Sequence, residues 1–219
     1  MNPSIIQLLV LAGIAIFLIL RLRSVLGTRE GFEKPRVEAP RATKRAKPEF
    51  DVIEGGPDPG ITDYVDADSD EATALSDMKS DDRTFNVREF LRGARGAYEM
   101  ILTGFEKGDL SDIKPFLSDD VYEAFAGVVE AREKEGLSVD FNFVGISETT
   151  LVGAEYDKST KEAEISVRFL CENTSAVYDK GGDLIEGSPT DVKKQRDVWT
   201  FGRKMGTDDV NWFLVATGE

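Results

Sequence analysis

The sequence contains no histidine and only one cysteine, Cys171. Without histidine the chain lacks the commonest general base and the commonest metal ligand at neutral pH, which disfavours hydrolases and metalloenzymes. A single cysteine cannot form an internal disulfide, in agreement with a reducing compartment. Nucleophile elbows, phosphate loops, dinucleotide fingerprints and cysteine-rich metal spacings are absent too. We therefore expect no enzyme activity, no cofactor and no metal site.

An enzyme that works through buried carboxylates is the catalytic alternative that these absences leave open. Its candidate acids are Asp140, Glu164 and Asp197. Glu164 alternates with apolar neighbours in a predicted strand, so solvent exposure is the simpler interpretation of that residue.

The sequence also has fewer basic than acidic residues. The chain has 27 Lys and Arg against 41 Asp and Glu, a formal net charge of -14. The charge lies in blocks, with net +6 over residues 21–47, -11 over 48–82 and -9 over 83–219. Nucleic-acid binding needs a basic face that neutralises phosphate, so we expect no nucleic-acid partner.

One long apolar run stands at the N-terminus, where residues 5–20 contain a single polar side chain, Gln7. Its length nearly matches a hydrocarbon core of roughly 30 Å, so we predict a transmembrane anchor over residues 1–23. The residues expected to face lipid are Ile5, Leu8, Leu11, Ile14, Phe17 and Leu20.

The basic residues after this run predict its orientation. Arg21 and Arg23 follow it directly and no Lys or Arg precedes it, which argues against a cleaved signal peptide. The positive-inside rule then predicts a single-pass protein with its N-terminus outside and the rest in the cytoplasm. Arg21 and Arg23 either only set this topology or also contact lipid headgroups.

Residues 24–83 are poor in large apolar side chains and rich in proline and charge, which predicts a flexible charged linker. Its acidic run at residues 66–71 superficially resembles a calcium loop. An EF-hand needs glycine at the sixth position and glutamate at the twelfth, but Glu71 and Asp77 stand there. We therefore interpret this run as a solvated spacer.

A helical period begins after this linker. Apolar residues recur at three and four positions over residues 87–107, Asn86 and Glu89 suit a capping box, and Gly108 suits the C-terminal end. Gly93 and Gly96 each weaken a helix by roughly 1 kcal/mol, which predicts close packing there. A short helix at 110–117 and a long one from Ser118 to residue 135 follow. Core packing explains the first stripe most simply, while a membrane-surface or partner-binding role is the alternative.

Strand patterns follow Gly136. Alternating apolar residues predict strands at 139–143, 151–156 and 163–169, then a hairpin around residues 179–182 and a last antiparallel pair over 192–205 and 210–217. Helices followed by antiparallel strands predict an α+β domain over residues 84–219, with two long helices packed on a curved sheet.

Aromatic residues on these strands give a candidate pocket for an acyl chain or a hydrophobic peptide. By period 2, Asp197 and Arg203 share a face with two of these aromatics. Structural contacts are the simpler interpretation of all of them. The predicted pocket wall consists of Phe141, Phe143, Phe169, Trp199 and Phe201.

Three stretches together resemble a known family: FLRGARGAYEMILTGFEKGD at 90–109, FLSDDVYEAFAGVVEAREKEG at 116–136, and DVWTFGRK at 197–204 with VNWFLVATGE at 210–219. They are similar to the bacterial Tim44-like proteins, relatives of the mitochondrial inner-membrane translocase scaffold. The resemblance implies a cystatin-like or NTF2-like shape, an apolar pocket, membrane association and an adaptor role. Residues 24–83 do not match the chaperone-contact region of the mitochondrial relatives.

These observations predict an adaptor or scaffold anchored in a bacterial inner membrane, with its domain on the cytoplasmic side. Its partners would be the membrane and other proteins, among them translocase, chaperone or membrane-protein clients of inner-membrane protein biogenesis or translocation. The alternative is a tethered carrier of a lipid or small apolar ligand.

Overall fold

A computed structural model describes residues 58–218. The chain divides into two units, residues 1–54 and residues 55–219, and the described residues belong to the second. The predicted anchor at 1–23 and the linker up to residue 57 lie outside the described residues. Within residues 58–218, no helix combines the length and the apolar character needed to cross a membrane.

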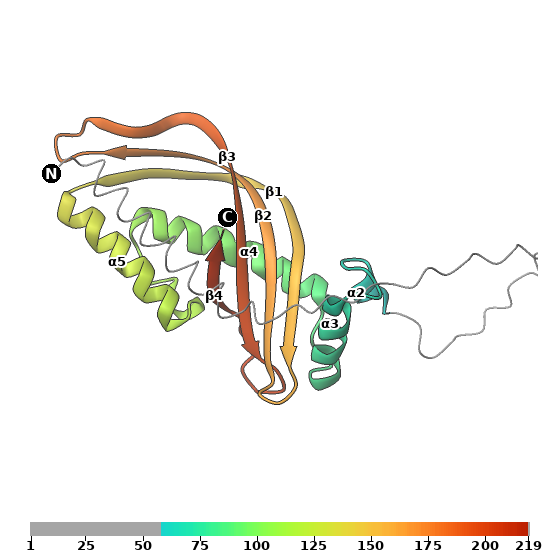
Figure 1. Cartoon of the computed structure of the whole chain (residues 1–219). Coiled ribbons are helices and arrows are strands. Elements are labelled where there is room, and N and C mark those ends of the chain that lie inside the picture. Colours follow the sequence, from blue (N-terminus) through green and yellow to red (C-terminus); the bar gives the residue numbers. More distant parts are fainter. Residues whose placement is uncertain (1–57, 219) are drawn as a thin grey trace, which may run out of the picture. The chain divides into compact units, whose positions relative to one another are not determined.

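A four-stranded antiparallel sheet is built from β1 (Ser138–Asp157), β2 (Glu162–Tyr178), β3 (Leu184–Lys204) and β4 (Phe213–Gly218), in that spatial order. The patterns predicted at 139–143 and 151–156 are thus one strand, and the one predicted at 163–169 belongs to a longer strand that runs on to Tyr178. The register of β1 against β2 shifts at three places, between residues 143 and 145, 146 and 148, and 151 and 153. Such bulges bend a strand, and Figure 1 shows the first three strands curving over the helices.

The two long helices begin and end where their capping residues predict. In α4 (Val87–Lys107) the Asn86 side chain accepts a hydrogen bond from the Glu89 amide at 3.1 Å. In α5 (Asp119–Glu135) Ser118 accepts one from Val121. Both helices end at glycines with positive φ, 75° at Gly108 and 69° at Gly136. The predicted short helix at 110–117 is reduced to one 3₁₀ turn, η1 (Lys114–Phe116).

Two helices in residues 58–83 correct the prediction that this stretch is flexible. They are α2 (Pro59–Thr62) and α3 (Asp70–Asp81), the latter capped by Ser69. Leu75 and Met78 of α3 are completely buried, while its acidic side reaches the β1–β2 turn through Asp77–Lys158 and Asp81–Lys161 ion pairs. A few apolar residues, spaced by helical turns, therefore suffice to place this acidic segment in the domain.

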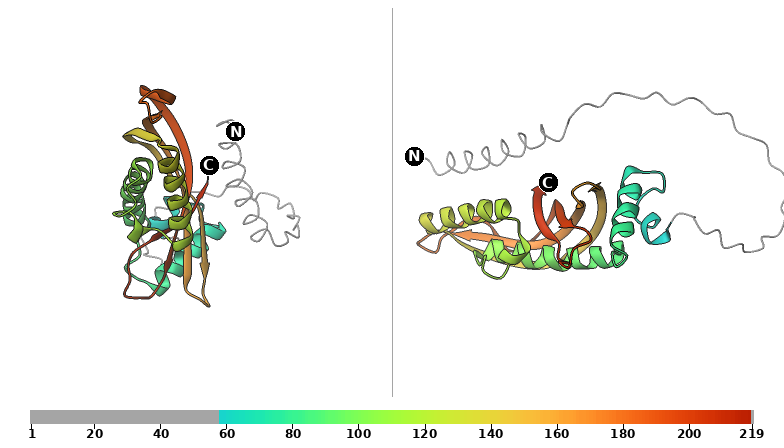
Figure 2. Two further views of the ribbon diagram at one scale, coloured as in Figure 1. Left: turned by 90° about the vertical axis from the view of Figure 1, so that its left-hand side faces the viewer. Right: turned by 90° about the horizontal axis from the view of Figure 1, so that it is seen from below.

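The hydrophobic core lies between α4 and the inner face of the sheet. Figures 1 and 2 show α4 and α5 on the concave side of the bent sheet. Helix α3 lies at the end of the sheet that carries the β1–β2 turn. The largest completely buried side chains come from every layer and include Leu75, Tyr98, Ile101, Ile165, Phe169, Phe201 and Leu214.

Candidate functional site

The five aromatic residues predicted to line a pocket lie on the inner face of the sheet, and three of them contact Tyr98 of α4. The Tyr98 ring lies 4.3 Å from that of Phe169, 4.5 Å from that of Trp199 and 6.3 Å from that of Phe143. Phe141 and Phe201 are also buried. Helix α4 therefore occupies the face that a ligand would contact, and the ligand-binding role of these rings stays a prediction.

A polar cluster accompanies these rings in the core. The Tyr98 hydroxyl donates to Asp197 Oδ2 at 2.5 Å and lies 3.1 Å from Cys171 Sγ, while Gln195 Nε2 donates to the same carboxylate at 3.0 Å. Burial, followed by the hydrogen bond to Asp197, raises the pKa of Tyr98 far above that of free tyrosine. The phenol thus stays protonated and holds α4 to β3.

The three candidate carboxylates of the catalytic alternative lie apart. Asp140 pairs with Ala176 near one end of the sheet, and Glu164 pairs with Gly202 near the other. Both side chains are exposed, whereas Asp197 is partly buried against Tyr98. The described residues also contain no group of three or more His, Cys, Asp or Glu side chains placed to hold a metal ion.

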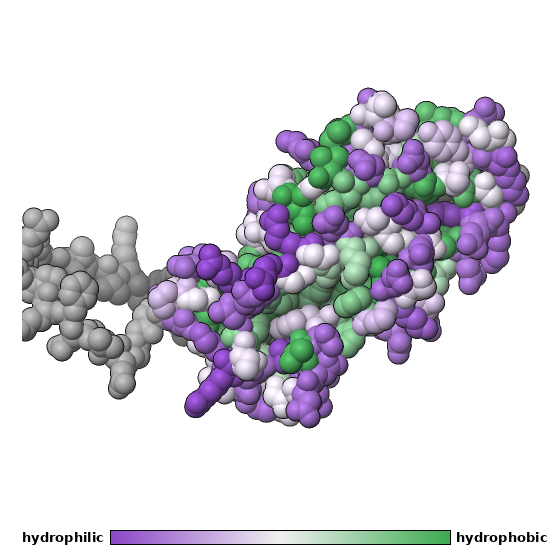
Figure 3. Space-filling view, turned by 180° about the vertical axis from the view of Figure 1, so that it is seen from behind, coloured by the Kyte–Doolittle hydropathy of each residue, from purple (hydrophilic) through white to green (hydrophobic). Residues whose placement is uncertain are grey.

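An open groove of about 500 Å³ runs along α4 and combines aromatic, aliphatic and charged side chains. Its floor is aromatic: the Phe90 ring lies 4.7 Å from that of Trp212 and 6.0 Å from that of Phe201. Met100 of α4 and Val210 of the β3–β4 loop border the groove and are 36% and 63% exposed. Figure 3 views the face that carries α4 and shows apolar side chains gathered in a hollow across its middle.

Gly93 and Gly96 line this groove, and the close packing predicted for them is not found in the described residues. A Cβ atom built on either glycine meets nothing within 4 Å. Gly104 differs, since its Cβ would lie 2.8 Å from Ile113. Packing inside the described domain therefore explains Gly104 but not the helix-weakening pair at 93 and 96.

The groove continues toward the C-terminal end of α4. A second hollow of about 410 Å³ shares Gly96 and Met100 with the first and reaches Lys107 and Ile113. Most of one side of α4 is thus open over several helical turns. An elongated partner fits this shape better than a compact one.

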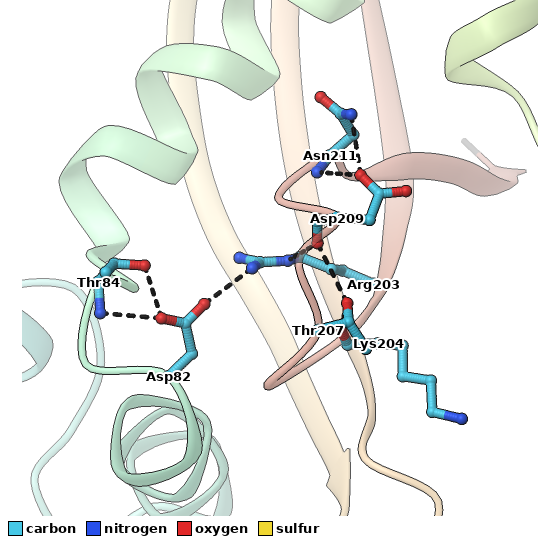
Figure 4. Close-up of polar contacts among 7 residues, drawn as sticks. All are labelled: Asp82, Thr84, Arg203, Lys204, Thr207, Asp209 and Asn211. Carbon is cyan, nitrogen blue, oxygen red and sulfur yellow. Dashed lines mark hydrogen bonds and ion pairs between the residues drawn. The ribbon is translucent and has the colours of Figure 1, made fainter.

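A buried ion pair closes the N-terminal end of the groove (Figure 4). Arg203 of β3, 8% exposed, donates from Nη2 to Asp82 Oδ2 at 2.8 Å and from Nε to the Asp209 carbonyl at 3.1 Å. The Thr84 hydroxyl and amide donate to the other Asp82 oxygen at 2.6 and 2.9 Å. Hydrogen bonding from Thr84 and the charge of Arg203 hold the pKa of Asp82 below its usual value.

The prediction that Asp197 and Arg203 share a face with Trp199 and Phe201 is confirmed. All four side chains point toward the helices, where Arg203 meets Asp82 and Asp197 meets Tyr98. Sequence reasoning missed the groove itself. The sequence feature that could have indicated the groove is the pair Gly93 and Gly96, because it lies where α4 has no neighbour in the described residues. The groove residues outside the predicted set include Phe85, Phe90, Met100, Val210 and Trp212.

Comparisons with known proteins give three findings. Residues 71–219 match the model of the Tim44-like domain family. A region of 142 residues is 22% identical to the mitochondrial import inner membrane translocase subunit TIM44-1 of Arabidopsis thaliana, covering 64% of this chain and 29% of that protein. The chain thus spans less than a third of that relative. The crystal structure of the intermembrane space region of chloroplast protein ARC6 aligns with a TM-score of 0.40 at 11% identity, over 58% of this chain and 94% of that one.

Proposed function

The chain belongs to the Tim44-like domain family, and on this premise we propose that it is a membrane-anchored scaffold that binds other proteins. Its role would lie in inner-membrane protein biogenesis or translocation. The name of the Arabidopsis relative, an inner membrane translocase subunit, supports this direction. The proposal includes the cystatin-like or NTF2-like shape that the sequence resemblance implies, and no enzyme activity.

The observation that carries the proposal is the open groove along α4. Protein interfaces are enriched in aromatic residues, Met and Arg, and the groove contains Phe116, Trp212, Met100 and Arg92. The domain thus offers an open groove with residues typical of protein interfaces beside its hydrophobic core.

Anchoring is proposed from the sequence. The apolar run at 5–20 followed by Arg21 and Arg23 supports a single span with the domain on the cytoplasmic side of a bacterial inner membrane. The measurement is fractionation with external protease. The full-length protein should pellet with membranes and be digested only after the inner membrane is opened. Digestion in intact spheroplasts would overturn this topology.

A carrier of a lipid or small apolar ligand is the second candidate. The groove volume of about 500 Å³ falls in the range of small-molecule sites. Native mass spectrometry of the detergent-solubilised chain tests it. A stoichiometric lipid that is displaced by Met100→Trp, without any protein partner, would favour the carrier over the scaffold.

The scaffold proposal is tested by photo-crosslinking in intact cells. A crosslinkable residue at position 100 lies in the groove, and the same residue at position 164 lies on an exposed part of β2 away from it. We expect protein adducts from position 100 and none from position 164, with the captured protein identified by mass spectrometry. Adducts of equal yield and identity from both positions, or none from either, would refute a protein-binding groove.

A further inference from the structure

Opposite charges lie on one flank of α4 beside the groove. Arg92 and Glu99 are seven residues apart, which places them two helical turns from each other on the same side. Arg92 has only an exposed local ion pair with Glu89, and Glu99 has no ion pair in the part of the chain that the structure describes. Both groups are exposed and can pair with a partner that carries the same charges in reverse order.

We propose that the protein that fills the groove is a second copy of this chain, with the two α4 helices antiparallel about a two-fold axis. This inference rests on the proposed function and names the partner of the same groove. A two-fold interface brings the same patch together from both copies, so it must be complementary to itself. The flank with Arg92 and Glu99 meets this requirement, since reversal of the helix exchanges the two charges.

The position of the axis follows from the helix rise. With the axis level with the midpoint between Arg95 and Gly96, Arg92 and Glu99 are each about 5 Å from it along the helix. Rotation by 180° then brings Arg92 of each copy level with Glu99 of the other, on the same flank. Two symmetry-related ion pairs form, one on each side of the axis.

The apolar contacts agree with this register. Met100 of each copy comes level with residue 91 of the other, between Phe90 and Gly93 on the groove side. At Gly93 and Gly96 an added Cβ atom would have no neighbour within 4 Å in the described part of the chain, so both positions are open to the partner helix. These glycines would then lie in an interface, which accounts for their cost to the helix.

The second wall of the groove stands at one end of α4. Val210 and Trp212 lie beside Phe90, near the N-terminal end of α4. In an antiparallel pair the two copies of this wall therefore stand at opposite ends of the helix pair. Each one encloses the C-terminal part of the other copy's α4.

Disulfide crosslinking of the full-length chain in its membrane tests this arrangement. Gly96→Cys places a thiol next to the axis, and Glu164→Cys places one on an exposed part of the sheet as the matched control. The native Cys171 is completely buried and does not compete. We expect mild oxidation to give a covalent dimer with Gly96→Cys and little with Glu164→Cys.

Charge reversal supplies the decisive comparison. In the Gly96→Cys chain, Arg92→Glu or Glu99→Arg alone places like charges opposite each other and should lower the dimer yield about tenfold. The double variant Arg92→Glu with Glu99→Arg restores both pairs and should restore the yield. Equal dimer yields in all four chains, or no dimer at all, would overturn the two-fold pairing. Photo-crosslinking from position 100 to a different protein would then leave the proposed function intact, while the loss of all adducts would remove both.

Discussion

The two ends of β3 pair with the same neighbour, β2, yet differ completely in burial. Trp199, Phe201, Arg203 and Met205 at its C-terminal end and just beyond are less than a tenth exposed, whereas the residues from 184 to 194 are exposed or nearly so. The exposed end is not polar, since Ile185 and Val192 are 54% and 55% exposed. At the C-terminal end Phe90 of α4 contacts Phe201, Asp82 after α3 pairs with Arg203, and β4 pairs with residues 198–202. Coverage by other elements, and not the apolar content of the strand, therefore decides which residues form the core.

The largest effect is expected at the covered end. Phe201→Ala removes a ring that is 2% exposed and contacts Phe90. We expect a loss of about 4 kcal/mol in the free energy of unfolding, because the ring is almost completely buried between α4 and the sheet. Urea unfolding followed by circular dichroism measures it. A loss under about 1 kcal/mol would mean that this end of β3 is not the core.

Breaking the buried ion pair should rank second. Arg203→Met leaves Asp82 charged and 11% exposed with only its Thr84 contacts, at a cost of about 3 kcal/mol. Arg168→Met is the matched control, because Arg168 pairs with Glu148 at 41% and 52% exposure. That exposed pair should contribute less than about 1 kcal/mol. Equal losses in the two variants would show that burial does not strengthen the Arg203 pair.

The pH dependence sharpens the same comparison. The pKa of Asp82 is lowered in the folded chain, so its stabilising contribution is complete above the ordinary carboxyl pKa and is lost as the pH falls through the folded value. The difference in the free energy of unfolding between the native chain and Asp82→Asn should therefore be constant near neutrality. It should shrink as the pH falls below the ordinary carboxyl pKa of about 4. Urea unfolding at several pH values measures it, and a difference independent of pH would contradict a lowered pKa.

The smallest effect is expected at the uncovered end. Ile185→Ala removes a side chain of about the same apolar character from the same strand, but at 54% exposure. We expect a change within about 0.5 kcal/mol, again by urea unfolding. A loss close to that of Phe201→Ala would indicate that another molecule or copy covers this end under the conditions of the measurement.

Local signals were sufficient for the elements that depend on neighbours in sequence. Asn86, Ser118, Gly108 and Gly136 predicted the ends of α4 and α5 because caps act within one helical turn. Helix α3 was missed because its acidic residues dominate the composition. The apolar side chains that place it, Leu75 and Met78, stabilise it only through contacts with distant residues.

The candidate site was less predictable than the fold. Period 2 correctly placed Trp199 and Phe201 on one face but could not show that Tyr98 fills the space before them. The floor of the groove is formed by Phe90 and Trp212, which are far apart in sequence. The two rings come into contact because the β3–β4 loop places Trp212 beside α4. In the sequence, only the glycine pair Gly93 and Gly96 of α4 indicated the groove. The two-fold pairing proposed above places the neighbour of these glycines in a second copy of the chain, not in the same domain.

Arg203 also joins two segments that lie next to the groove, the end of α3 and the β3–β4 loop. Asp82 directly follows α3, and the Asp209 carbonyl belongs to the loop whose next residues form the outer wall of the groove. One guanidinium therefore bridges the end of α3 and that wall, in addition to the core contacts of Leu75 and Met78 in α3. Loss of this guanidinium would remove the polar link between α3 and the outer wall of the groove.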